Sequence, residues 1–122
     1  MICLLAGTKV VPLLAGAITL AWTHSVEKVL WEEDWRSGPA GLELVEARVR
    51  GSGAGMEPPP EAEFSNGVWK WHPKVPLLRE VVLRRSGATA DWQICKEGRC
   101  QPMSDLVPPD VDPVVMQPCA GP

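Results

Sequence analysis

Glycine and proline divide most of this chain into short runs, a pattern typical of strands joined by turns. The 122 residues include 11 glycines and 13 prolines, spread between short apolar runs. No segment of helical length keeps an apolar period of 3.6 residues, whereas several short runs alternate apolar and polar residues. The sequence therefore predicts an all-β fold, a small antiparallel β-sandwich or barrel built from short hairpins, with residues 1–122 forming a single domain.

Turn residues define the expected strands. The clearest turn is Asn66-Gly67, because this pair provides the positive φ angles of a type I′ hairpin between Glu61–Phe64 and Val68–Trp71. Gly7-Thr8 is a second two-residue link. Pro12 lies in the strand that follows this link, and a proline there predicts that the strand is at a sheet edge or a bulge. The other expected strands are Ile2–Ala6, Lys9–Leu14, Ile18–Val26, Val29–Trp35, Leu42–Arg50, Leu77–Arg85, Ala90–Cys95, Cys100–Met103 and Pro113–Cys119.

Two irregularities are expected within this pattern. The apolar parity shifts between Leu44 and Val45, which predicts a β-bulge in that strand. Residues 104–112 are rich in proline, and we expect them to be loosely ordered.

Composition narrows the function classes. The chain is 45% hydrophobic, as globular proteins are, and its formal net charge is -3. Nucleic-acid binding is not expected, because it needs a clustered positive surface. The basic residues are densest at two places, Arg48 with Arg50 and Arg84 with Arg85. We interpret both as solvent-exposed strand edges.

The first 22 residues are strongly apolar, but they fit neither a secretory signal nor a membrane span. No positive region precedes the apolar run, and Lys9 and Pro12 interrupt it. We therefore expect no transmembrane segment in this chain. An extracytoplasmic or membrane-associated location is favoured if an export signal is missing upstream, and a cytoplasmic one otherwise.

Four cysteines allow three disulfide pairings. Cys95 and Cys100 flank a four-residue hairpin loop that would place them opposite each other, and Cys3 and Cys119 lie near the two chain ends. Bridges 95–100 and 3–119 would suit an oxidising compartment. The alternatives are four reduced thiols and, more weakly, a zinc site formed by Cys95, Cys100, Cys119 and His72.

Ionisable residues fall on an apolar strand face. Alternate residues of a strand point to the same face. One face of the first run carries Ile18, Leu20, Trp22, His24 and Val26, and one face of the next run carries Val29, Trp31, Glu33 and Trp35. If the hairpin pairs Trp22 with Glu33, then His24 lies diagonally from Glu33. A buried His–Glu pair that pins the sheet is the simplest interpretation.

Two functional alternatives remain for this pair. A metal site would need a third ligand such as His72 or Asp34. A catalytic triad would need a nucleophile, but Ser25 points to the opposite face, and nothing places Ser52 nearby. We therefore predict no catalytic residue, no metal and no cofactor.

Two further segments are candidates for binding. Residues 51–56 are glycine-rich but lack the lysine of a phosphate-binding loop. A plain structural turn is the default interpretation, and the functional alternative is a loop that presents Met56 and the prolines from Pro58 to a partner. Trp69 and Trp71 share one face of a short strand, where tryptophans serve either as core residues or as binding anchors.

The combined motifs resemble a bacterial family. Residues 20–27, 31–35, 41–48 and 51–60, with Cys3, the Cys95/Cys100 pair and Cys119, are similar to the family known as domain of unknown function 1850. Its motif positions here are His24, Ser25, Glu27, Glu33, Gly53, Gly55, Met56 and Pro58.

Members of that family tend to be encoded beside permeases and substrate-binding proteins of TAXI-type TRAP transporters. The resemblance implies a non-enzymatic accessory or interaction domain whose partner is a TRAP permease or its substrate-binding protein, and it brings no catalytic residues. The alternative is a small-ligand or metal-binding module, with or without enzymatic activity, centred on His24 and Glu33.

Overall fold

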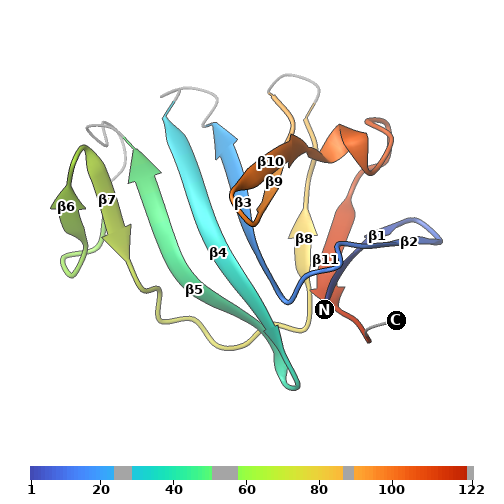
Figure 1. Ribbon diagram of the computed structural model, residues 1–122, viewed down its shortest axis with the longest axis horizontal. Helices are drawn as coiled ribbons and strands as arrows, with labels where there is room; N and C mark the ends of the chain where they lie inside the picture. The colour runs from blue at the N-terminus through green and yellow to red at the C-terminus, as the bar shows by residue number, and fades with distance from the viewer. Residues whose placement is uncertain (24–28, 51–57, 87–89, 121–122) are drawn as a thin grey trace.

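Two antiparallel β-sheets pack face to face in the computed structural model (Figure 1), which describes residues 1–23, 29–50, 58–86 and 90–120. The strands are β1 (Ile2–Ala6), β2 (Lys9–Pro12), β3 (Ala17–Thr23), β4 (Leu30–Gly38), β5 (Gly41–Arg50), β6 (Glu63–Ser65), β7 (Val68–Trp71), β8 (Val81–Leu83), β9 (Gln93–Lys96), β10 (Arg99–Pro102) and β11 (Val114–Pro118). The four-stranded sheet has the order β2-β1-β11-β8, and the seven-stranded sheet has the order β10-β9-β3-β4-β5-β7-β6.

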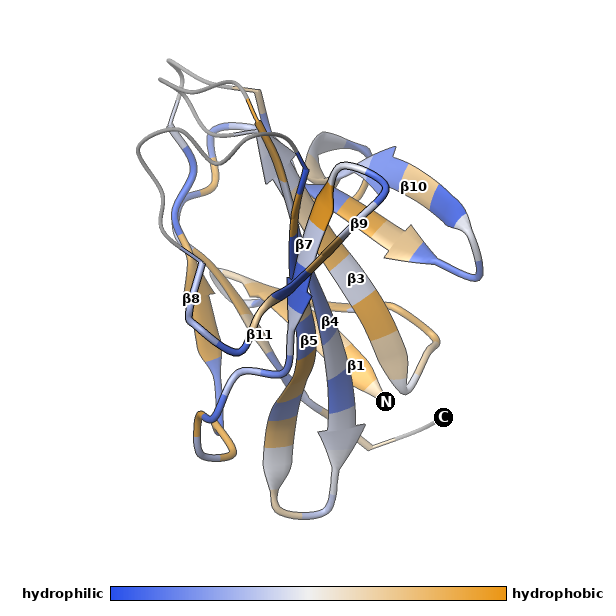
Figure 2. Cartoon of the chain, turned by 90° about the vertical axis from the view of Figure 1, so that its left-hand side faces the viewer, coloured by the Kyte–Doolittle hydropathy of each residue, from blue (hydrophilic) through white to orange (hydrophobic). Residues whose placement is uncertain are grey.

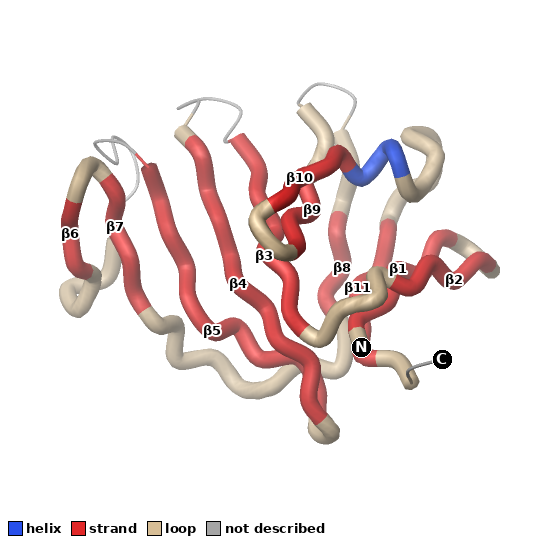
Figure 3. The backbone as a smooth tube through the Cα atoms, in the orientation of Figure 1, coloured by secondary structure: helices blue, strands red, loops and turns tan. Residues whose placement is uncertain are grey.

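The expected all-β class is confirmed, and the sandwich is the form that it takes. Figure 3 shows strands throughout the described chain and one short 3₁₀ helix, Met103–Asp105. No described helix is both long enough and apolar enough to cross a bilayer.

Local turn chemistry is confirmed where the sequence signal was strongest. Asn66 and Gly67 have φ angles of 53° and 77° and join β6 to β7. The expected bulge is present: Asp34 pairs with Glu46 while Trp35 pairs with Leu44, which leaves Val45 as the extra residue. Pro12 lies in β2, an edge strand.

The expected register of the β3–β4 hairpin was wrong. Trp22 pairs with Trp31, and Leu20, rather than Trp22, is opposite Glu33. The assignment of faces was nevertheless correct, because a shift of two residues keeps every side chain on its side of the sheet. β3 ends at Thr23, so His24 lies outside the described residues.

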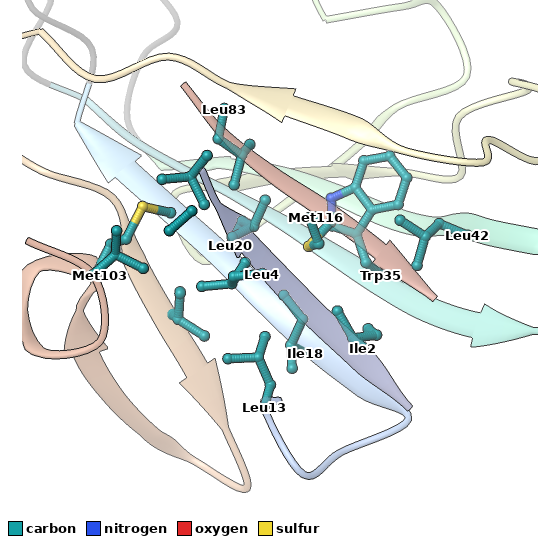
Figure 4. Packing of buried hydrophobic residues seen from close by; sticks show 14 residues of the cluster. Ile2, Leu4, Leu13, Ile18, Leu20, Trp35, Leu42, Leu83, Met103 and Met116 are labelled. Carbon is teal, nitrogen blue, oxygen red and sulfur yellow. The ribbon is translucent and has the colours of Figure 1, made fainter. Parts of the chain in front are cut away.

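Both sheets contribute to one apolar core (Figure 4). The small sheet provides Leu4 and Met116, the large sheet provides Leu20 and Leu42, and the 3₁₀ helix adds Met103; each of these five residues has no exposed surface. Figure 2 shows the alternation of apolar and polar residues along the large sheet that this packing requires.

The two expected disulfides are present. Cys3–Cys119 ties the start of β1 to the residue after β11, with Cα atoms 5.8 Å apart, and Cys95–Cys100 joins directly opposed residues of β9 and β10. All four cysteines are used in these bonds, so both the reduced-thiol and the zinc alternatives are overturned.

Two of the arginines expected on solvated edges are largely buried. The side chain of Arg48 is 15% exposed and binds Asp34, Glu46 and Glu32 on the outer face of the large sheet. The side chain of Arg85 is 5% exposed and pairs with Asp91 at 2.7 Å. Arg84, at 73%, is exposed as expected.

Candidate binding site

A row of tryptophans crosses the inner face of the seven-stranded sheet. The rings of Trp22 and Trp31 stack with centroids 5.9 Å apart and an interplanar angle of 7°. Trp71 meets Trp31 edge-on at 6.3 Å, and Trp92 lies against Trp22 at 5.0 Å. All four residues are half-buried, so the row is neither a closed core nor a fully open surface.

Strand register explains this row. Trp22 and Trp31 are direct cross-strand partners. On β5, the small residues Ala47 and Val49 separate Trp31 from Trp71 and are themselves 3% and 2% exposed. Short side chains on the intervening strand let the large rings on either side reach each other.

Trp92 was not singled out from the sequence, although it belongs to the row. It lies just before β9, has the same parity as the core residue Ile94, and packs against the core. Its Nε1 donates a hydrogen bond to the carbonyl oxygen of Arg84 at 2.9 Å. Its shared parity with Ile94 was the signal that could have identified it.

Two polar groups lie within this aromatic surface. Glu33 is on the same face as Trp31 and accepts a hydrogen bond from Nε1 of Trp35 at 3.3 Å, while burial raises the pKa of its carboxyl. Nε1 of Trp31 is buried and has no hydrogen-bond partner among the residues that the structure describes. A carboxyl with a raised pKa and an indole N–H without a partner in the described part of the chain are both groups that can hydrogen-bond a polar ligand group.

The raised pKa of Glu33 predicts a pH-dependent change in stability. A group whose pKa is higher in the folded state contributes most below its unfolded pKa, and this contribution is lost as pH rises through the folded value. Glu33→Gln removes the ionisation. We therefore expect its free energy of unfolding, relative to the parent chain, to rise from about pH 4 to about pH 7 in urea titrations.

Asp34→Asn is the control, because its effect on stability should change with pH in the opposite direction. The hydrogen bond from Arg48 holds the pKa of Asp34 below its usual range, so the stability that Asp34 contributes is present above its unfolded pKa and lost as pH falls. Asp34→Asn should therefore be most harmful near neutral pH. If the two variants followed the same pH trend, the assigned environments would be wrong.

The edge hairpin β6–β7 extends the aromatic surface. Phe64 and Trp69 are direct cross-strand partners with ring centroids 4.8 Å apart, and Phe64 is 55% exposed. Trp69 and Trp71 are on one face, as their parity predicted, but they have different neighbours: Trp71 contacts Trp31, and Trp69 contacts Phe64.

The metal set centred on His24 and Glu33 is not assembled from the described residues. Asp34 is on the outer face, where its carboxylate binds Arg48 and the hydroxyl of Thr19. The Nδ1 atom of His72 lies 2.9 Å from the carbonyl oxygen of Val45. Across the described ranges, no three histidine, cysteine or acidic side chains are grouped so that they could hold a metal ion.

Several predicted site residues lie outside the described residues. Pro58 is the first residue described after the glycine-rich segment. Those outside are His24, Ser25, Glu27, Ser52, Gly53, Gly55 and Met56.

The fold and the site together define a disulfide-bonded β-sandwich whose larger sheet carries a surface of tryptophans. The family model described as Domain of unknown function (DUF1850) matches residues 18–103, and the chain therefore belongs to this family. Comparisons with curated proteins and with solved structures gave no match.

The matched region corresponds to a recognisable part of the structure. It contains the strands of the seven-stranded sheet together with β8. β1, β2 and β11 lie outside it, although they provide the core residues Ile2, Leu4 and Met116. The structural unit is therefore larger than the matched segment.

Proposed function

We propose that this chain is a non-enzymatic accessory domain that binds a component of a TAXI-type TRAP transporter, either the permease or the substrate-binding protein. The choice of transporter comes from the family resemblance. The binding role rests on the aromatic pair of the β6–β7 hairpin, in which Phe64 is exposed and Trp69 is half-buried. The two parts of the proposal therefore have separate support.

The hairpin has the properties of an interaction surface. Phe64 and Trp69 lie on β6 and β7, at the side of the molecule away from β1, β2, β8 and β11 (Figure 1), so the small sheet does not cover them. Large aromatic side chains are the residues that most often provide binding energy in protein interfaces. A partner that covers this pair would bury apolar area that is now in water.

The disulfides support an extracytoplasmic setting for this interaction. Disulfides persist in oxidising compartments and are rare in the cytosol. Two of them hold this chain, one between its ends and one within an edge hairpin. The domain would thus meet the transporter on the side of the membrane where substrate-binding proteins act.

Affinity capture from detergent-solubilised membranes of the native host tests the proposal. We expect the tagged parent chain to retain a TAXI-type permease or its binding protein. Phe64→Ala combined with Trp69→Ala should reduce recovery by at least about tenfold, the loss that removal of an interface anchor causes.

Val82→Ala is the matched control, because Val82 is 53% exposed but lies on β8 in the small sheet. It should leave recovery unchanged. Recovery of no transporter component by the parent chain, or equal recovery by the double variant and the control, would contradict the proposal. Urea midpoints of the three proteins establish that each is folded.

A small-ligand site at Glu33 is the second candidate function. The specific observation is that Glu33, whose carboxyl has a raised pKa, shares one aromatic face with Trp31, whose Nε1 has no partner within the described ranges. If ligands bind there, Trp31→Phe should remove binding with little change in the urea midpoint, because it deletes the indole donor and keeps an aromatic ring. Unchanged binding of such a ligand would assign it to another site.

A further inference from the structure

A cleft of about 800 Å³ lies between the connection that follows β2 and the β9–β10 hairpin. This volume is within the range of small-molecule sites. β9 and β10 are at the opposite edge of the large sheet from β6 and β7, so the cleft is separate from the proposed docking hairpin (Figure 1).

The floor of the cleft is apolar and continuous with the core. Leu13 and Ile94 line it and are 6% and 3% exposed, and both belong to the core cluster; half-buried Leu106 packs beside them. A hydrocarbon chain in this cleft would therefore contact side chains that the fold already holds in place.

Leu14, which lines the cleft, has an unusual exposure and an unusual backbone conformation for a leucine. Its side chain is 67% exposed and its φ angle is 58°, a region that bulky residues rarely occupy. Backbone hydrogen bonds fix the residues on either side, from Leu13 N to Ile2 O at 3.0 Å and from Ile2 N to Ala15 O at 2.9 Å. A leucine held in a strained conformation and displayed to solvent is typical of a functional site.

Two cations line the same cleft. Nζ of Lys96 donates a hydrogen bond to the carbonyl oxygen of Leu13 at 2.8 Å, and its other two donors have no partner among the described residues. Arg99 is exposed, and neither it nor Glu97 forms an ion pair within the described ranges. Glu97 is the one carboxylate in the lining, so the cations outnumber it.

We propose that this cleft binds a small aliphatic monocarboxylate. The carboxylate lies at Lys96 and Arg99, and the hydrocarbon chain extends along Leu13, Leu14, Ile94 and Leu106. Charge complementarity favours an anionic head group, and the volume of the cleft favours one short chain.

Octanoate is the probe, titrated into the disulfide-intact chain and followed by NMR chemical shifts. We expect saturable binding, with acetate and the neutral octanamide each binding at least about tenfold more weakly. Arg99→Gln and Leu14→Ser should each weaken octanoate binding by about fivefold or more.

Arg79→Gln and Val10→Ser are matched controls at exposed positions outside the cleft, and they should leave the affinity unchanged. The proposal is overturned if octanoate does not saturate, if octanamide binds equally well, or if the controls lose as much affinity as the cleft variants. Binding to anionic phospholipid vesicles without binding to octanoate would assign the cleft to a membrane head group and would also overturn it. None of these outcomes depends on capture of a transporter.

Discussion

Removing the bridge between the chain ends, by Cys3→Ala together with Cys119→Ala, should lower the free energy of unfolding by about 4–5 kcal/mol. This disulfide joins residues 116 positions apart, and cross-linking such distant residues removes a large amount of conformational entropy from the unfolded chain. Domains of this kind have about 5–15 kcal/mol of stability in total, so the loss is severe. Urea denaturation followed by tryptophan fluorescence measures it.

Cys95→Ala together with Cys100→Ala is the matched control. These cysteines are only 5 positions apart, so the same reasoning predicts a loss of about 2 kcal/mol. The difference between the two double variants is the informative quantity, because it cancels effects common to disulfide removal. Equal losses would show that loop closure is not how the terminal bridge stabilises this fold.

Arg85→Met should be the most harmful substitution of a charged residue, with a loss of about 3 kcal/mol. The guanidinium uses all five of its N–H donors: two bind the carboxylate of Asp91, and three bind the carbonyl oxygens of Val107, Pro108 and Val111. Methionine keeps the apolar stem but leaves these acceptors unpaired. Urea midpoints and slopes measure the change.

Arg84→Met is the neighbouring control. The side chain of Arg84 is 73% exposed and its ion pair with Asp112 is 3.3 Å long. The substitution should therefore lower the free energy of unfolding by no more than about 0.5 kcal/mol. If both arginine variants had similar stability, Arg85 would not be the link between β8 and the segment before β11.

The faces of the strands could be read from the sequence, but the register of the first hairpin could not. Alternation has a period of two, so pairing Trp22 with Glu33 or with Trp31 places the same side chains inward. The length of the connection decides between the two registers, and the sequence has no turn signal as clear as Asn66-Gly67 there. The turn signals at Gly7-Thr8 and Asn66-Gly67 depend on local residues alone, and both are confirmed.

Burial of arginine was the other feature that alternation missed. Arg48 follows the polar parity of its strand, which predicts exposure. Arg85 lies past the end of β8, two residues after the buried Leu83, and its charge alone had predicted exposure. Arg85 is buried because its partners come from residues 107–111, and Arg48 because acidic residues from two strands surround it. Such contacts between distant segments leave no periodic signal.

The candidate site was predictable in part. Parity placed Trp69 and Trp71 on one face and Glu33 among apolar neighbours, and the structure agrees. It did not indicate that Trp71 reaches Trp31 across β5, because that contact depends on the small size of Ala47 and on the pairing of β5 with β7.

Direct binding of the purified, disulfide-intact chain to the purified TAXI-type permease and to its substrate-binding protein tests the central claim most directly. Biolayer interferometry, with the transporter component immobilised in detergent, gives the affinity. We expect saturable binding to one of the two components, weakened by at least about tenfold in the Phe64→Ala/Trp69→Ala variant and unchanged in Val82→Ala. Absence of saturable binding to both components, with a chain that unfolds cooperatively in urea, would contradict the accessory role.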